Sequence, residues 1–212
     1  MRTCDALPKC VAPGVAPERG RMARRKVIFV KGGHYHLYNR GANRQPIFRD
    51  DDNYRFLLSR VKQAAAEQQV SVLAYCLMPN HFHFVLRQDG DRPLSGFMQA
   101  VFNSYTKAFN KRYERSGTLF EGPYRARAVT TEEYLLHLCR YVHRNPLEAG
   151  LVTRLDDWPY SNYPEWVEAR PGALVDRAFV QSRFPAPEAY VRFLLEYTPP
   201  ERLERLVKQL ES

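Results

Sequence analysis

Hydrophobic positions recur along the chain with two different periods, and these periods divide residues 34–145 into seven elements. An alternation of period two predicts four strands, at 34–40, 70–77, 81–87 and 124–129. Spacings of three and four predict three helices, at about 50–68, 94–112 and 131–145. The order β-α-β-β-α-β-α predicts an α+β fold with a split βαβ (ferredoxin-like or RRM-like) antiparallel sheet and helices on one of its faces.

Local signals refine the limits of these elements. Thr130 and Glu133 have the spacing of a capping box, so they should begin the third helix. The pair Asn145-Pro146 should end it, because a residue before proline is disfavoured in the helical region. In the second strand, one face of the sheet should carry three residues: Val70, Val72 and Ala74.

The sequence on either side of these elements lacks their regularity. Residues 1–25 mix Pro, Gly, Ala and Arg, which predicts a disordered basic leader, and Met22 offers an alternative start. Residues 26–165 should form the main domain. Residues 166–212 should form a C-terminal extension, with a Pro-rich connector and a closing helix from Pro199 to Leu210.

The strand at 81–87 carries the first candidate chemistry. It follows a tight turn in the run MPNHFHFVL at 78–86, so His81 and His83 should point to one face and the phenylalanines to the other. Two neutral imidazoles are ligands for a divalent metal, but they make only half a site.

The third helix can supply the missing half, since Tyr141 and Asn145 lie one turn apart on one side of it. If this helix packs on the histidine face, the mixed N/O ligand set favours Mg²⁺ or Mn²⁺ beside a tyrosine hydroxyl. A helical tyrosine is also a common core residue, so the spacing leaves that reading open.

The charge is uneven along the chain. The formal net charge is +9, and residues 1–150 hold 24 Lys/Arg against 13 Asp/Glu while residues 151–212 hold 8 against 10. A basic segment that also holds the histidines favours a polyanionic partner such as nucleic acid. No apolar run approaches the ~20 residues of a membrane span, so no membrane partner is expected. None of the cysteines forms a CxxC pair, and we expect reduced thiols with Cys76 and Cys139 in the core.

Basic and aromatic residues supply candidate DNA contacts, although each is as readily a solvated charge or a core ring. The candidate phosphate contacts are Arg40, Arg44, Lys107, Lys111, Arg112, Arg125 and Arg127. The candidate stacking rings are Tyr35, Tyr38, Phe120, Tyr124, Trp158 and Tyr160.

Other polar residues near these motifs have competing roles. His34 and His36 form a second HxH pair without the MPN turn, and we expect His36 in the sheet near the site and His34 at a strand end. His137 either lines the site or is satisfied elsewhere, and His143 should be structural or exposed. Glu121 is either an acid near the metal or a turn stabiliser.

These motifs occur together in a known family. The sequence resembles the single-tyrosine HUH transposases of the IS200-like type and, within them, the REP-associated tyrosine transposases of bacteria. HUH denotes His, a hydrophobic residue and His, here His81-Phe82-His83. The resemblance extends over most of residues 27–165 and is carried by MPNHFH at 78–83, RYVHRNP at 140–146 and WPYSNY at 158–163.

The resemblance implies a mechanism and partners. His81, His83 and Asn145 would hold Mg²⁺ or Mn²⁺, and Tyr141 would attack hairpin-bearing, REP-like single-stranded DNA to give a 5′-phosphotyrosine that is later rejoined. It also implies a monomer rather than a dimer, acting on nucleoid DNA in the bacterial cytoplasm. Two alternatives stay open, a nucleic-acid-binding module without strand transfer and a metal-dependent hydrolase that uses water.

Overall fold

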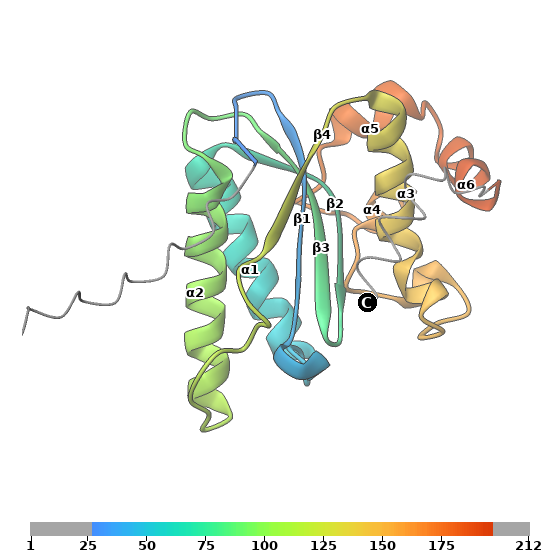
Figure 1. Cartoon of the computed structure of the whole chain (residues 1–212). Helices are drawn as coiled ribbons and strands as arrows, with labels where there is room; N and C mark the ends of the chain where they lie inside the picture. Colours follow the sequence, from blue (N-terminus) through green and yellow to red (C-terminus); the bar gives the residue numbers. More distant parts are fainter. Residues whose placement is uncertain (1–26, 197–212) are drawn as a thin grey trace, which may run out of the picture.

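The computed structural model describes residues 27–196 and builds them around one antiparallel sheet (Figure 1). Its strands are β1 (His34–Arg40), β2 (Val70–Met78), β3 (His81–Gln88) and β4 (Arg125–Val129). The strand order is β2-β3-β1-β4, which is the arrangement of a split βαβ fold. The predicted leader at 1–25 and the closing helix at 199–210 lie outside the described residues.

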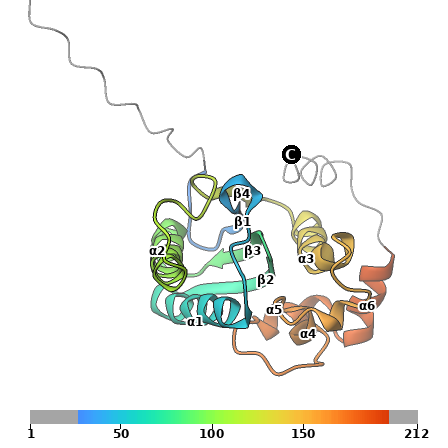
Figure 2. The same cartoon turned by 90° about the horizontal axis from the view of Figure 1, so that it is seen from below.

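Helices cover both faces of the sheet, whereas the sequence led us to expect them on one face. On one face lie α1 (Asp51–Gln68) and α2 (Leu94–Arg112), and on the other lies α3 (Glu132–Glu148) (Figures 1 and 2). The reason is that the strands are apolar on both sides. Phe82 and Phe84 pack in the core under α1 and α2, while Cys76 and Val85 belong to a second core with α3. The predicted α+β class is confirmed.

A bulge in β2 changes which of its residues share a face. The pairing with β3 shifts between Val72 and Ala74, so Leu73 is an extra residue in the strand. Val70 and Val72 therefore face α1 and α2, whereas Leu73 and Ala74 both belong to the core on the α3 side. The expectation that Val70, Val72 and Ala74 share one face is wrong for Ala74.

The ends of α3 differ by a few residues from the prediction. The N-cap is Thr131 rather than Thr130, because its backbone is extended and its hydroxyl accepts a hydrogen bond from the Tyr134 amide at 3.3 Å. Pro146 lies inside the helix, so Asn145-Pro146 does not end it. The helix ends at Glu148. Gly150 follows with φ +67° and donates its amide to the Leu147 carbonyl, while the Leu151 amide donates to the Pro146 carbonyl, which is a Schellman arrangement.

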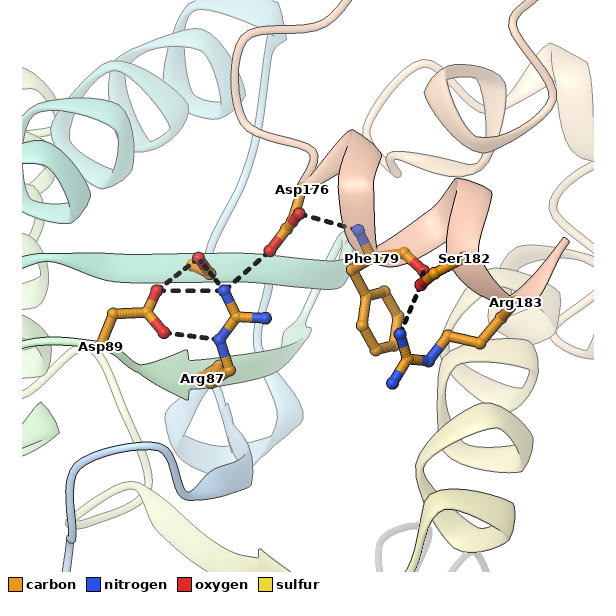
Figure 3. A network of polar contacts seen from close by, with 7 residues as sticks. Arg87, Asp89, Asp176, Phe179, Ser182 and Arg183 are labelled. Atoms are coloured by element: carbon orange, nitrogen blue, oxygen red, sulfur yellow. Dashed lines mark hydrogen bonds and ion pairs between the residues drawn. The ribbon is translucent and has the colours of Figure 1, made fainter. Parts of the chain in front are cut away.

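The C-terminal extension is helical where a connector was expected. Three short helices follow on the α3 side of the sheet, α4 (Tyr163–Trp166), α5 (Arg177–Arg183) and α6 (Pro187–Leu195). Figure 3 shows how α5 is attached: Arg87 on β3 donates to Asp176 at 2.9 Å, and Asp176 accepts from the Phe179 amide. Within residues 27–196 no helix is both long and apolar enough to cross a bilayer.

The WPYSNY segment protects the outer edge of β2. The Leu77 amide donates to the Tyr160 carbonyl at 2.9 Å, and the Tyr75 amide donates to the Asn162 side-chain oxygen at 2.7 Å. The Asn162 side chain also donates to the carbonyl of the bulged Leu73 at 2.9 Å. An exposed strand edge can pair with another chain, and here its polar groups are satisfied within the molecule.

Candidate functional site: two histidines, an asparagine and a tyrosine

The turn before β3 is held by the loop after β1. The Gly41 amide donates to the Asn80 carbonyl at 2.7 Å, and the Ile47 amide donates to the Pro79 carbonyl at 2.8 Å. This contact fixes the two-residue turn between β2 and β3, and with it the first residue of β3, His81. The loop at residues 41–47 and the MPN turn at 78–80, which are far apart in sequence, therefore form one support.

The tautomer of His81 follows from its neighbour Asn80. The Asn80 side-chain nitrogen donates to the Arg44 carbonyl at 3.2 Å, which leaves its oxygen as the acceptor 2.7 Å from His81 Nδ1. His81 Nδ1 therefore carries the proton, and the lone pair of Nε2 is free. Burial lowers the pKa of His81 and outweighs the opposing effect of the Asn145 oxygen, and Arg40 lowers the pKa further, so the ring is neutral at pH 7.

His83 has an equivalent support from a third histidine. Its Nδ1 lies 3.0 Å from Nε2 of His36 on β1, and both rings are buried. Burial lowers the pKa of His83 well below its usual value, and burial together with Arg127 lowers the pKa of His36 to about 3. With both rings neutral, His36 Nε2 can accept the Nδ1 proton of His83 and leave His83 Nε2 free as a ligand.

Helix α3 brings the other two predicted residues to this face. The Asn145 side-chain oxygen lies 3.1 Å from His81 Nε2. The Tyr141 ring is 7% exposed and meets the His83 ring edge to face, with centroids 5.6 Å apart. The predicted docking of this helix onto the histidine face is therefore what the structure shows, within a single chain.

The contact between His81 and Asn145 fits a cation. With the His81 proton on Nδ1, the lone pairs of His81 Nε2 and of the Asn145 oxygen converge with no hydrogen between them. Neighbouring ligands in an octahedral Mg²⁺ site are also about 3 Å apart, given bond lengths of about 2.1 Å. Among the described residues there is no cluster of three or more His, Cys, Asp or Glu side chains that could hold a metal, and the side chain that meets His81 here is the Asn145 amide.

Three of the predicted basic residues share the histidine face. Arg40 lies opposite His81 in the β1–β3 pairing and forms an ion pair with Glu121. Of the two expected roles of Glu121, this contact favours the one that stabilises the turn. Arg125 and Arg127 follow on β4 and lie opposite Tyr38 and His36. The Arg127 side chain donates to the Tyr38 hydroxyl at 3.4 Å.

The remaining basic candidates lie elsewhere. Arg44 is exposed in the loop that supports the Asn80 turn. Lys107 and Lys111 are exposed on α2, on the opposite side of the sheet. Arg112 is engaged by Asp50 and Asp52 at the start of α1.

The other histidines are structural. His143 is fully buried, bonded to the Tyr190 hydroxyl at 2.6 Å and the Asn162 side-chain oxygen at 2.9 Å, and burial lowers its pKa to about 4. His137 bonds to Arg140 and faces the ring of Phe193 on α6, away from the His81 side of α3. The support that His36 gives His83 was not recognised from the sequence, although its position in the second HxH pair was a usable signal.

Similarity to known proteins identifies the family. The family described as "Transposase IS200 like" matches residues 29–145, which is more than half of the chain. The chain belongs to the IS200-like transposases. The stated resemblance to this family is confirmed, and with it a role of the transposase type.

The similar relatives of this transposase are of the REP-associated kind. A REP-associated tyrosine transposase of Escherichia coli is 22% identical over 143 residues, covering 67% of this chain and 83% of that protein. A Haemophilus influenzae protein assigned to the same group is 24% identical over 152 residues, covering 66% and 85%. A solved REP-associated tyrosine transposase bound to a REP hairpin has the same fold, with a TM-score of 0.60 and 19% identity, covering 73% of this chain and 94% of that one.

Proposed function

We propose that this transposase cleaves and rejoins hairpin-bearing, REP-like single-stranded DNA through a 5′-phosphotyrosine on Tyr141, with Mg²⁺ or Mn²⁺ held by His81, His83 and Asn145. The observation that carries the proposal is the approach of the Asn145 oxygen to His81 Nε2 at 3.1 Å, on the helix that also carries Tyr141. A divalent ion bound there would polarise the scissile phosphate and favour ionisation of a nearby phenol.

The covalent step belongs to Tyr141. Its phenolic oxygen attacks the phosphorus in line and loses its proton, while the bond from phosphorus to the 3′-oxygen breaks and that oxygen leaves as a 3′-hydroxyl. The new tyrosyl phosphodiester keeps the energy of the broken bond, so a later 3′-hydroxyl can reverse the step and join DNA without a nucleotide cofactor.

The neighbouring side chains position and neutralise the DNA. Arg40 and Arg127 lie on the histidine face, where their positive charges would partly neutralise the negative charge of a phosphodiester. The Tyr141 and His83 rings are in contact within one chain, which supports a monomer acting in cis.

The cytoplasmic location and the limits of the leader and the extension stay predictions.

The proposal is tested with labelled single-stranded hairpins and purified protein on a denaturing gel. In Mg²⁺ or Mn²⁺ the wild type should give a covalent protein–DNA product, and Tyr141→Phe should abolish it. Tyr134→Phe is the matched control, because Tyr134 lies two turns earlier on the same side of α3 and is not adjacent to Asn145. A Tyr141→Phe protein that cleaves as well as the wild type would show that the nucleophile is wrongly assigned.

The same gel separates the two alternative functions. A binding module would leave the hairpin uncleaved and give no adduct in either metal. A hydrolase would release cleaved DNA without an adduct, because the oxygen of water, and not that of Tyr141, would form the new bond to phosphorus. Either result would overturn the covalent mechanism.

A further inference from the structure

A second tyrosine lies on the histidine face, and the proposed chemistry gives it no role. Tyr38 of β1 lies opposite His83 in the β1–β3 pairing, so the two side chains share one face of the sheet. The Tyr38 ring lies beside the supporting pair of histidines, with its centroid 4.7 Å from that of His36 and 6.0 Å from that of His83. Tyr38 is 6% exposed and Tyr141 is 7% exposed, so both phenols are buried to a similar extent.

The Tyr38 ring is not open to a nucleobase, although the sequence suggested that it could stack on one. A base stacks on an accessible aromatic face. The Tyr38 ring packs on His36 at an interplanar angle of 32° and is almost wholly buried. The group of Tyr38 that can act on a ligand is therefore its hydroxyl.

The Tyr38 hydroxyl has a proton that no described residue accepts. Arg127 Nε donates to the hydroxyl oxygen at 3.4 Å, and a guanidinium cannot accept a hydrogen bond, so the Tyr38 proton points elsewhere. Within residues 27–196, no acceptor lies within hydrogen-bond distance of that proton. Buried side-chain donors nearly always have an acceptor, so this one favours an acceptor on a bound ligand.

The contact with Arg127 also shows which acceptor suits this hydroxyl. A cation that donates to a hydroxyl oxygen polarises its O–H bond, and successive hydrogen bonds of this kind strengthen one another. Such a donor is best matched by an oxygen that carries negative charge. In DNA cleavage, the oxygens around the scissile phosphorus are the ones on which charge develops.

The two phenols approach His83 from opposite sides. Tyr141 comes from α3, which packs on β2 and β3, and its ring meets the His83 ring edge to face. Tyr38 comes from β1, which follows β3 in the order β2-β3-β1-β4 and so lies on the other side of it from β2. In phosphoryl transfer the attacking and leaving oxygens lie roughly in line, with phosphorus between them. A phosphate attacked by Tyr141 beside His83 would therefore present its leaving 3′-oxygen to the β1 side.

We propose that Tyr38 is a further catalytic residue of the cleavage step, and that its hydroxyl donates a hydrogen bond to the departing 3′-oxygen. The proposal rests on the proposed function, because it takes Tyr141 as the nucleophile. As the bond from Tyr141 to phosphorus forms and the bond to the 3′-oxygen breaks, this hydrogen bond stabilises the negative charge on the departing oxygen. The 3′-oxygen then takes a proton from water, and Tyr38 keeps its own. In rejoining, the same hydroxyl positions the incoming 3′-hydroxyl.

The test compares two hairpins in Mn²⁺, one natural and one with sulfur in place of the scissile 3′-oxygen, by the single-turnover rate of adduct formation. Tyr38→Phe keeps the ring and removes the hydroxyl, so it should slow the reaction of the natural DNA about a hundredfold. It should slow the sulfur DNA by less than about threefold, because a thiolate leaves readily and is a weak hydrogen-bond acceptor. Tyr134→Phe is the matched control and should react with both DNAs as the wild type does.

Metal binding separates this role from a structural one. The Tyr38 ring lies beside His83, so a variant that disturbed the histidines would also weaken Mn²⁺ binding. Loss of a group that supports a ligand weakens metal binding about 10–100-fold, whereas Tyr38→Phe should leave the Kd for Mn²⁺ within about twofold of the wild type. The EPR signal of free Mn²⁺ measures this Kd.

Three results would overturn the proposal: an unchanged rate of Tyr38→Phe with the natural DNA, an equal loss of rate with both DNAs, or weakened Mn²⁺ binding. Failure of the proposed function has a different signature. If the wild type formed no adduct with either DNA, the covalent mechanism and the role of Tyr38 would both be refuted. If the wild type and Tyr38→Phe formed the adduct equally fast, only the role of Tyr38 would be refuted.

Discussion

Asn162 joins three parts of the molecule, and its loss should be costly. Its side-chain oxygen accepts from the Tyr75 amide of β2 and from His143 Nε2 of α3, and its side-chain nitrogen donates to the Leu73 carbonyl. Because that nitrogen faces a carbonyl, the oxygen must be the acceptor, so His143 carries its proton on Nε2 and accepts on Nδ1 from the Tyr190 hydroxyl.

The size of the effect of Asn162→Ala follows from the groups left without a partner. The Tyr75 amide and His143 Nε2 would become buried donors without an acceptor, while the Leu73 carbonyl still accepts from Trp166 Nε1 at 2.9 Å. An unsatisfied buried group costs about 1–3 kcal/mol, so two should lower the free energy of unfolding by about 2–6 kcal/mol. That is a large share of the ~5–15 kcal/mol typical of a domain.

Urea unfolding followed by tryptophan fluorescence measures this change, since Trp158 and Trp166 both donate to carbonyls of β2. Gln63→Ala removes an exposed amide from α1 and should change the free energy of unfolding by less than about 0.5 kcal/mol. A loss below about 1 kcal/mol for Asn162→Ala at unchanged m-value would refute the view that WPYSNY ties α3 to the sheet.

Three further changes test the supports of the site. The pKa of His143 is lowered to about 4 in the folded protein and is about 6.5 in the unfolded chain, so its contribution to stability is lost as pH falls from about 6.5 towards 4. The free energy of unfolding should fall by about 2 kcal/mol at pH 5 in urea titrations. A His143→Gln protein with the same pH slope as the wild type would contradict this assignment. His36→Ala should weaken Mn²⁺ binding about 10–100-fold, measured from the EPR signal of free Mn²⁺, and an unchanged Kd would exclude His36 as the partner of His83. Gly41→Ala would place a Cβ 2.0 Å from the Gln45 carbonyl oxygen, so it should lower Tm by several degrees in calorimetry, and a Tm within one degree of the wild type speaks against a rigid loop.

Much of the sheet and of its helices follows from hydrophobic period alone. β1 and α2 begin and end at the predicted residues, and the two-residue turn lies where MPN indicated. Periodicity cannot show an inserted residue such as Leu73, because a bulge leaves the local apolar run intact. It also could not show that α3 continues through Pro146 to Glu148, where the carbonyls of Leu147 and Pro146 accept from the Gly150 and Leu151 amides.

The site was visible in the sequence only in part. The HxH spacing places His81 and His83 on one face, and the i, i+4 spacing places Tyr141 near Asn145, but their meeting depends on which face α3 covers. The supports of the ligands are set by contacts between distant segments, as when Asn80 orients His81. The sequence placed His36 in the sheet near the site, but its contact with His83 depends on the pairing of β1 with β3, and so this role was not identified before the fold was known.

The most direct test of the covalent mechanism is to identify the residue that carries DNA. The protein is incubated with Mn²⁺ and a single-stranded hairpin, digested with trypsin and nuclease, and analysed by tandem mass spectrometry. We expect a nucleotide joined through its 5′-phosphate to Tyr141, and no such adduct in Tyr141→Phe. An adduct on another residue, or one joined through a 3′-phosphate, would contradict the mechanism.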